Sequence, residues 1–358
     1  MYKPTQATLT ATTGASPVEM PQPPASSPLP FLASRRPRAG AWQNATPLIL
    51  VPGHSSSTGM RIIVLFALAA SLQLAGWAGS LGLVVLGSGG PRPFGRGGTS
   101  YLVEIDGAPR ILVDCGPGTF LRVGELKLDL DRVDTLLLTH LHIDHTGDLP
   151  GFFLARTLTA RAPAIRFLVF GPAGSGVFPS TTRFLNLLFE KGGAWEYQKA
   201  FGSDEEIHGT DLPIELNSPI DRIVDVDGLR VTAIATHHGD CPSVAYRVDY
   251  DKESIVFSGD MDASAVPNLV RLAKGCSLLV FHCAVLDPPN SPSQLYALHT
   301  PPHRIGEAAR DAGARRLLLS HIAPDVEEAS RAVLQSIRAS YQGPIGFAHD
   351  KMRVPVSP

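Results

Sequence analysis

The chain contains the sequence Thr139-His140-Leu141-His142-Ile143-Asp144-His145, at the end of an apolar stretch, residues 135–139, that we expect to be a buried β-strand. Within it, His140, His142, Asp144 and His145 can each bind a metal. Imidazole nitrogens and carboxylate oxygens suit zinc and related divalent metals. A loop this short cannot surround two metal ions, so the pattern predicts further ligands from distant segments.

The second half of the chain offers such ligands, again directly after apolar stretches. Residues 229–235 lead into His237 and His238, residues 254–258 into Asp260, and residues 317–320 into His321. Functional sites of layered α/β folds collect at the carboxyl ends of strands. We therefore predict a metal site built from both halves of the chain, with His237 and His238 as rivals for one ligand position.

Apolar stretches punctuated by Gly, Pro and Asp continue from residue 81 onward and predict the regular elements. We expect strands at residues 81–87, 100–105, 110–113, 135–139, 166–170, 229–235, 244–250, 254–258, 278–281, 317–320 and 345–348. We expect helices at residues 150–158, 181–189, 302–312 and 326–339, and an irregular segment at 190–228. Strands that first run together and later alternate with helices predict two sheets between layers of helices.

The first eighty residues differ from the rest. Residues 1–59 contain ten prolines and little apolar periodicity, which predicts a disordered segment or an over-long gene start. Residues 60–80 start with Met60-Arg61, continue with an apolar run and end in small residues, the pattern of a signal peptide or signal anchor. A buried first element of the domain at 81–358 is the alternative.

Either export signal places that domain outside the cytoplasm. Positively charged residues stay on the cytoplasmic side of a membrane signal, and here they precede the apolar run: Arg35, Arg36, Arg38 and Arg61. We expect a periplasmic or secreted protein, or one anchored in the membrane and facing outward. The apolar run is shorter than the roughly 20 residues that a membrane span needs. We therefore expect no stable span in the mature protein.

Bulk composition adds two constraints. The formal net charge is −2, without the basic excess that is typical of nucleic-acid-binding proteins. The cysteines form no C-x-x-C pair, which argues against a zinc ribbon. If the protein is exported, a disulfide bond between two of the cysteines stays an open alternative. These cysteines are Cys115, Cys241, Cys276 and Cys283.

The ligand order His-x-His-x-Asp-His, then His, then Gly-Asp, then His resembles the metallo-β-lactamase superfamily. The segments 86–91 (LGSGGP), 113–116 (VDCG), 257–260 (FSGD) and 317–321 (LLLSH) look like the branch that holds ribonuclease Z, arylsulfatase-like enzymes and phosphodiesterases. The resemblance implies an α/β fold, the αββα four-layer sandwich of that superfamily. Dimers are common among such relatives, so a homodimer stays open.

The resemblance also implies two divalent metal ions bridged by Asp260. Its ligand sets are His140, His142 and His238 for one ion, and Asp144, His145 and His321 for the other. Asp114 would order the loop without touching metal. We expect Zn²⁺, with Mn²⁺ or Fe²⁺ as alternatives that these ligands do not separate.

Two divalent cations about 4 Å apart share a water and lower its pKa, so the expected nucleophile is a metal-bridged hydroxide. Asp144 would bind metal and orient that nucleophile. His299 resembles the histidine that the ribonuclease Z branch places before its last metal-bearing strand, and we expect it to assist the leaving group. His282, directly after the strand at 278–281, is a further catalytic candidate.

We expect an exported hydrolase that cleaves a small-molecule phosphodiester or a related sulfate or carboxylic ester. A tRNA 3′-processing endoribonuclease is the first alternative. Against it, export separates the enzyme from precursor tRNA, residues 171–228 carry acidic side chains where a basic arm would bind RNA, and His282-Cys283 departs from the His-Glu pair of ribonuclease Z. These features argue against a nucleic-acid partner, which stays an open alternative. A β-lactam hydrolase and a non-catalytic metal-binding module are the remaining alternatives.

Overall fold

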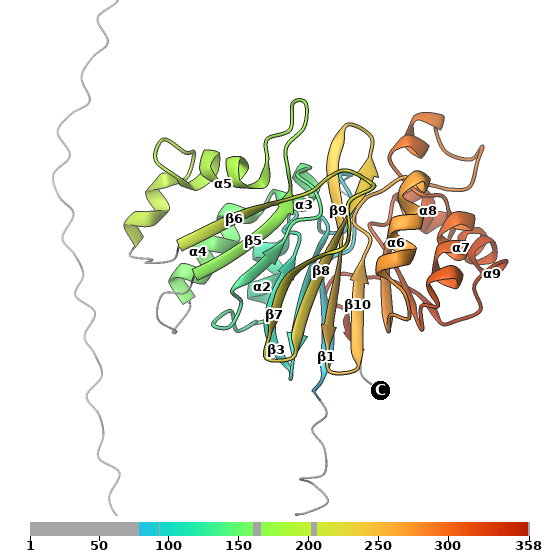
Figure 1. The fold of residues 1–358 in the computed structure, drawn as a ribbon, viewed down its shortest axis with the longest axis horizontal. Coiled ribbons are helices and arrows are strands. Elements are labelled where there is room, and N and C mark those ends of the chain that lie inside the picture. The colour runs from blue at the N-terminus through green and yellow to red at the C-terminus, as the bar shows by residue number, and fades with distance from the viewer. Residues whose placement is uncertain (1–78, 93, 160–165, 202–205, 357–358) are drawn as a thin grey trace, which may run out of the picture. The chain divides into compact units, whose positions relative to one another are not determined.

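Two seven-stranded sheets lie at the centre of the structure, with helices on both outer sides (Figure 1). The computed structural model describes residues 79–92, 94–159, 166–201 and 206–356. Residues 1–59, for which we expected disorder or an over-long gene start, and residues 60–78 of the export signal expected at 60–80 lie outside the described residues. No helix among the residues described is long and apolar enough to cross a membrane.

The first sheet has the strand order β14-β1-β2-β3-β4-β5-β6. Strands β1 to β3 pair antiparallel, whereas β3 to β6 run parallel. The strands are β1 (Leu81–Gly87), β2 (Ser100–Ile105), β3 (Ala108–Val113), β4 (Thr135–Leu137), β5 (Arg166–Pro172), β6 (Glu206–Leu212) and β14 (Arg353–Pro355).

The second sheet repeats this plan with the order β13-β12-β11-β10-β9-β8-β7. Strands β7 to β10 pair antiparallel and β10 to β13 run parallel. The two halves of the chain therefore share one topology, although the sequence shows no repeat of fixed period. The strands are β7 (Asp221–Val226), β8 (Leu229–His238), β9 (Cys241–Tyr250), β10 (Glu253–Phe257), β11 (Leu278–His282), β12 (Leu317–Ser320) and β13 (Ile345–Phe347).

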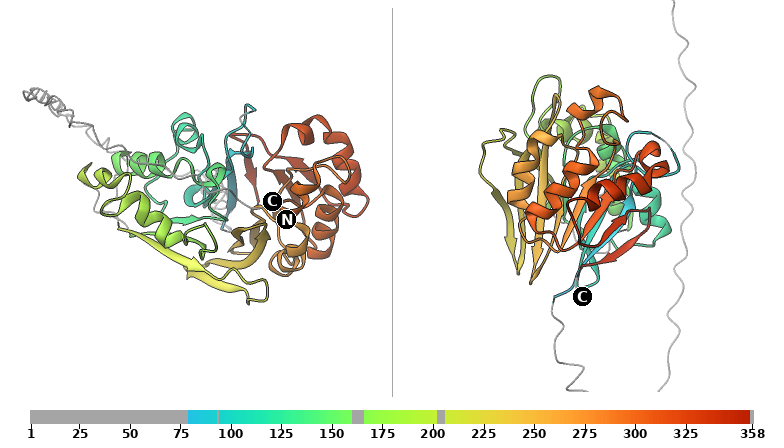
Figure 2. Two further views of the ribbon diagram at one scale, coloured as in Figure 1. Left: turned by 90° about the horizontal axis from the view of Figure 1, so that it is seen from above. Right: turned by 90° about the vertical axis from the view of Figure 1, so that its right-hand side faces the viewer.

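Three layers of buried apolar side chains hold these elements together. One lies between the two sheets and includes Leu83 and Phe257. The second joins the first sheet to helices α2, α4 and α5 and includes Phe152, and the third joins the second sheet to α6, α7 and α9 and includes Ile305. Figure 2 shows the two helical layers on opposite sides, so the expected four-layer αββα sandwich is confirmed. The helices are α2 (Thr119–Glu125), α3 (Ile143–Thr146), α4 (Leu149–Thr159), α5 (Thr181–Phe189), α6 (Val266–Leu272), α7 (Pro302–Ala312), α8 (Pro324–Glu328) and α9 (Ser330–Arg338), with short 3₁₀ turns η1 (Glu196–Phe201), η2 (Ala263–Ala265) and η3 (Ser293–Ala297).

Helix α7 illustrates why the sequence forms these elements. Pro302 starts it, where a missing N–H costs nothing, and Gly313 ends it in the left-handed conformation with a φ of 63°. Between them Ile305, Ala308, Ala309 and Ala312 are buried. That spacing places one apolar stripe against the second sheet.

The prediction of an irregular segment at 190–228 is wrong. It contains η1, β6 and β7. Strands β6 and β7 are the outermost strands of their sheets and are largely half-buried or exposed. Edge strands with charged residues carry little of the apolar alternation by which strands are recognised.

Smaller differences concern the ends of elements. The helix expected at 326–339 is divided into α8 and α9, and α2, α3, α6 and β14 were not predicted. Strand β8 extends to His238, beyond the expected end at residue 235. Strand β4 ends at Leu137, which frees the following residues to turn into the predicted metal-binding loop.

Candidate metal centre

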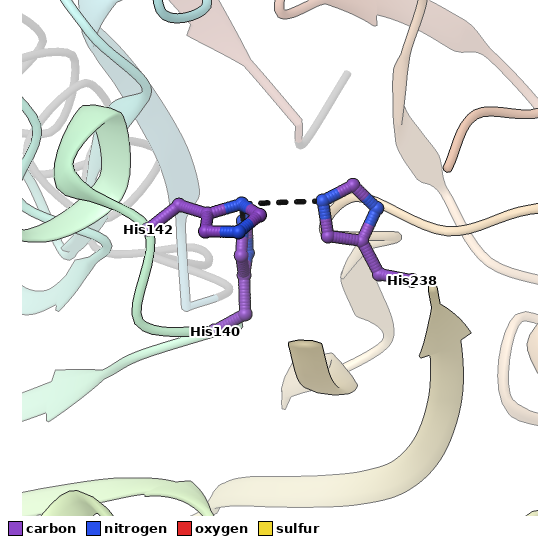
Figure 3. Close-up of side chains that lie close together, drawn as sticks. All are labelled: His140, His142 and His238. Atoms are coloured by element: carbon purple, nitrogen blue, oxygen red, sulfur yellow. Dashed lines mark hydrogen bonds between the residues drawn. The ribbon is translucent and has the colours of Figure 1, made fainter. Parts of the chain in front are cut away.

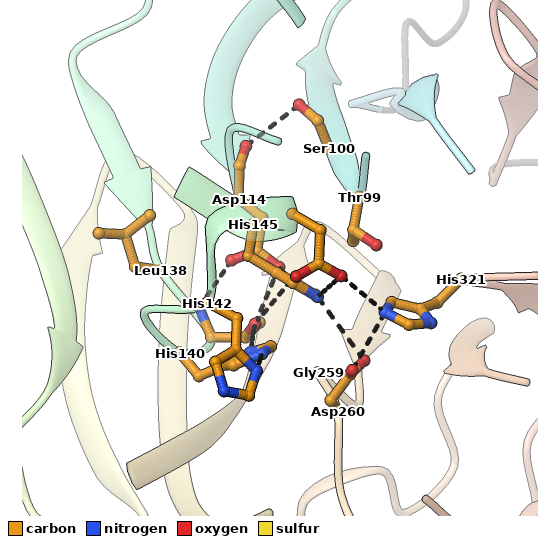
Figure 4. A network of polar contacts seen from close by, with 12 residues as sticks. Thr99, Ser100, Asp114, Leu138, His140, His142, His145, Gly259, Asp260 and His321 are labelled. Carbon is orange, nitrogen blue, oxygen red and sulfur yellow. Dashed lines mark hydrogen bonds and ion pairs between the residues drawn. The ribbon is translucent and has the colours of Figure 1, made fainter. Parts of the chain in front are cut away.

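The predicted ligands come together at one edge of the two sheets, where several strands end (Figures 3 and 4). The loop after β4 carries His140 and His142, and α3 carries Asp144 and His145. From the second sheet, His238 is the last residue of β8, Asp260 follows β10 and His321 follows β12. Rigid strand ends thus fix side chains that lie far apart in the sequence.

Three imidazoles form the first cluster, namely His140, His142 and His238 (Figure 3). Their ligand atoms lie within 4.8 Å of one another. The Nδ1 atom of His142 lies 3.1 Å from Nε2 of His140 and 3.3 Å from Nε2 of His238. This arrangement offers one metal ion several nitrogen donors.

The second cluster consists of Asp144, His145 and His321, also within 4.8 Å. The Oδ2 atom of Asp144 lies 3.2 Å from Nε2 of His321 and 3.6 Å from Nε2 of His145. Asp260 faces both clusters: its Oδ2 atom lies 3.1 Å from His321 Nε2 and 3.9 Å from His238 Nε2. It therefore lies between the two donor sets that the resemblance assigned to separate ions.

Three buried polar atoms of the predicted ligands lack a hydrogen-bond partner among the described residues, namely Nδ1 of His321, Nε2 of His145 and Oδ1 of Asp260. The last two lie 3.8 Å apart. Buried polar atoms nearly always have a hydrogen-bond partner in folded proteins. The lone pairs of Nε2 of His145 and Oδ1 of Asp260 are therefore available to bind a cation. The nitrogen and carboxylate donors here fit divalent metal ions.

Asp114 holds the loop from the side away from the clusters. Its Oδ1 accepts a hydrogen bond from the backbone N–H of Thr139 at 2.7 Å, and its Oδ2 accepts from the Thr139 hydroxyl at 2.8 Å. The same Oδ2 lies 2.8 Å from Nδ1 of His145. A proton on that Nδ1 leaves Nε2 of His145 free to bind metal, the usual arrangement behind a metal-bound histidine.

Burial and charge set the protonation of the histidines. Burial lowers the pKa of His140 well below its ordinary value, which keeps that imidazole neutral. For His321, burial alone would lower the pKa, but the carboxylates of Asp260 and Asp144 outweigh it and raise the pKa to about 10. The pKa of His145 is raised in the same way, since Asp114 and Asp260 outweigh its burial.

The structure brings His238, rather than its rival His237, to the centre. His238 is buried, and its Nδ1 donates to the carbonyl of Leu298 at 2.8 Å. That bond leaves Nε2 for the cluster. The His237 ring is instead half-exposed and lies 2.6 Å from the Asp262 carboxylate through Nδ1.

The two further catalytic candidates lie in different surroundings. Nδ1 of His299 lies 3.8 Å from Oδ2 of Asp260 and has no hydrogen-bond partner. Burial lowers the pKa of His299 to about 2, so this imidazole is neutral. It is the candidate that faces the centre with a free ring atom.

His282 is held by protein groups on both ring nitrogens. Its Nε2 accepts from the backbone N–H of Thr300 at 3.1 Å, and its Nδ1 lies 3.3 Å from the Ser258 hydroxyl. Both ring nitrogens of His282 therefore contact protein groups, and the catalytic role expected for this residue stays a prediction. His282 supports the loop that carries His299.

Sequence reasoning missed Phe178, whose ring contacts that of His142 edge to face at a centroid distance of 5.7 Å. No sequence pattern links this loop residue to the site, since only the fold brings the segment after β5 to the loop after β4. The four cysteines are all buried and free. The disulfide left open by the sequence is therefore absent among them.

Comparison with known proteins identifies the family to which the chain belongs. The family model described as a β-lactamase superfamily domain matches residues 109–322. A ribonuclease Z from Mycobacterium sp. (strain KMS) is 30% identical in an alignment of 293 residues that covers 77% of this chain and 96% of the relative.

Two solved structures resemble the fold. Human tRNase Z, short form, has 20% sequence identity and a TM-score of 0.58, with 77% of this chain and 100% of that chain covered. The metallo-β-lactamase fold protein YhfI from Bacillus subtilis has 18% identity and a TM-score of 0.58, with 77% and 99% covered. At these identities the two structures establish the fold alone.

Proposed function

This chain belongs to the metallo-β-lactamase superfamily and is a metal-dependent hydrolase, and from that premise we propose that it cleaves small phosphodiesters with two divalent ions at the centre described above. The observation that carries the proposal is Asp260, a buried carboxylate within 3.9 Å of nitrogen donors from both clusters. One carboxylate facing two donor sets suits a pair of cations. Related sulfate and carboxylic esters are the nearest variants of this substrate class.

The predicted ligands would divide between two metal ions. His140, His142 and His238 would hold one ion, and Asp144, His145 and His321 the other, with Asp260 between them. Two such ions would lower the pKa of a bound water and polarise the ester oxygen. We propose Zn²⁺ first, since imidazole and carboxylate donors suit it, with Mn²⁺ and Fe²⁺ as alternatives.

Two side chains would take part in the reaction beyond holding metal, one at the attacking water and one at the leaving group. Asp144 would orient the attacking water through a carboxylate oxygen. His299 would assist the leaving oxygen by donating a hydrogen bond from its neutral ring, because its lowered pKa excludes an imidazolium near neutral pH. His282 would keep His299 in place through the Thr300 backbone.

A tRNA 3′-processing endoribonuclease is the second candidate function. The 30% identity to a ribonuclease Z over 96% of that relative favours it. The acidic side chains at 171–228 and the His282-Cys283 pair still favour a smaller substrate.

We propose in addition that the domain acts outside the cytoplasm. This proposal rests on the sequence of residues 60–80 alone. A homodimer is a further proposal, which a direct measurement of the oligomeric state tests.

A substrate panel tests the proposal. The full chain, loaded with Zn²⁺, would be assayed with bis(p-nitrophenyl) phosphate, p-nitrophenyl sulfate, p-nitrophenyl acetate, a cephalosporin and a precursor tRNA. We expect phosphodiester turnover that falls roughly 100-fold or more in His140→Ala and stays unchanged in the control His208→Ala, a half-exposed histidine on β6. Cleavage of tRNA alone would select the second candidate. Absence of all turnover in a folded, metal-loaded protein would refute the hydrolase proposal.

A further inference from the structure

A pocket of about 110 Å³ opens beside the metal centre, with His299 and His321 in its wall. Most of the remaining lining is small or apolar and includes Ala284 and Leu295. Apart from the two histidines, Arg92 is the one described residue of the lining with an ionisable side chain. The Arg92 guanidinium thus lies at the same small pocket as two histidines of the centre.

The loop that carries Arg92 is packed directly against the metal centre. A Cβ atom on Gly90 would lie 2.4 Å from Cε1 of His321. Such a distance leaves no room for any side chain at position 90. The close approach fixes the start of the loop, so Arg92 is held at the pocket two residues later.

The Arg92 guanidinium is weakly engaged by the protein. Its ion pair with Asp325 spans 3.7 Å, and half of its side chain is exposed. Arg96, in the same loop, is instead held by several hydrogen bonds to protein groups. It donates to Ser88 and Ala348 at 2.7 and 2.8 Å and binds both oxygens of Glu327. Arg96 therefore secures the loop, whereas the donors of Arg92 remain available to a ligand.

We propose that this pocket binds one organic substituent of a phosphodiester and that Arg92 binds a non-bridging oxygen of the same phosphoryl group. The planar guanidinium matches phosphate oxygens in geometry and charge. A closed cavity of roughly 150 Å³ accepts benzene. The pocket beside the metal centre has about 110 Å³ and is open to solvent, so it suits a single ring or a short alkyl group. The inference rests on the proposed function and narrows its substrate class to anionic diesters with one such substituent.

Replacement of Arg92 tests the charge. Arg92→Gln, Arg92→Lys and the control Arg331→Gln, an exposed arginine on α9, would be compared in the full, Zn²⁺-loaded chain. For Arg92→Gln we expect kcat/KM for bis(p-nitrophenyl) phosphate to fall roughly 10- to 100-fold, the loss of one hydrogen bond to a charged group. Binding of phenyl phosphate, measured by calorimetry, should weaken by a similar factor while metal content stays unchanged. Arg92→Lys should recover part of both losses.

Replacement of Ala284 tests the pocket. Ala284→Leu reduces its volume, and we expect the ratio of kcat/KM for bis(p-nitrophenyl) phosphate to that for methyl p-nitrophenyl phosphate to fall about tenfold. An unchanged ratio would overturn the pocket assignment. Unchanged diester kinetics and phenyl phosphate binding in Arg92→Gln, or a loss accompanied by loss of metal, would overturn the role of Arg92. A wild-type chain that cleaves no phosphodiester would overturn the proposed function, and this inference with it.

Discussion

At the scale of single residues, Asp114 explains how a short loop presents several donors at once. It is fully buried and connects the Thr139 backbone to the ring of His145. The residue itself adopts a positive φ of 55°, which aspartate tolerates better than most residues. One carboxylate therefore sets both the path of the loop and the proton position on a metal ligand.

Replacing Asp114 by Asn should weaken metal binding roughly 10- to 100-fold. The amide has one acceptor oxygen instead of two, so it cannot serve Thr139 and His145 together. Competition with a chromogenic chelator measures the change. The control Asp251→Asn alters an exposed turn residue and should bind metal like the wild type. Equal affinity in both variants would contradict the role of Asp114.

Metal binding should release protons. Before metal binds, the raised pKa of His321, about 10, keeps this ring protonated near neutral pH, and the ring must lose the proton before its Nε2 binds a cation. We expect about one proton per chain from His321 and a further contribution from His145. Calorimetry in buffers of different ionisation enthalpy measures the release, and a binding heat that is independent of buffer would contradict it.

At the scale of elements, the end of each strand positions the chemistry. The sequence predicted these ends because buried strands such as β12 read as continuous apolar runs that stop at a histidine. It did not predict the edge strands β6 and β7, where apolar alternation is weak. The contact of Phe178 with His142 was also beyond sequence reasoning, because it depends on how β5 lies beside β4.

The link between β3 and α2 requires a glycine. A Cβ atom on Gly116 would lie 2.0 Å from the carbonyl oxygen of Asp144, so Gly116→Ala must displace the α3 backbone. We expect it to destabilise the fold by about 2–4 kcal/mol and to lower metal content. The matched change Gly124→Ala, in α2 with nothing within 4 Å of the added methyl group, should be neutral or stabilise by about 0.5–1 kcal/mol. Urea denaturation compares the two, and equal effects would contradict the packing argument.

At the scale of the whole molecule, the metal centre joins the two sheets. Its donors come from both halves of the αββα sandwich, for example His140 after β4 and Asp260 after β10. The sequence was sufficient to predict the layers, because strands that first run together and later alternate with helices indicate two sheets between helical layers. The resemblance to the metallo-β-lactamase superfamily implied which donors share one cluster, and the packing of one sheet on the other is what brings them together.

Because the ions would connect the sheets, removing metal should lower stability. Binding at about a thousand times the Kd stabilises a fold by about 4 kcal/mol, which for a domain of this size corresponds to a drop in Tm on the order of 10 °C after chelation. Thermal denaturation with EDTA, and again after Zn²⁺ is restored, measures the effect. An unchanged Tm would argue against a structural link through metal.

The number of metal ions per chain tests the central claim most directly. Plasma mass spectrometry would count metal in the wild type, in Asp260→Asn and in the exposed control Asp251→Asn. A centre bridged by Asp260 predicts about two ions in the wild type and the control, and about one or fewer in Asp260→Asn. A folded wild-type chain without metal, or an Asp260→Asn chain that retains two ions, would contradict the account.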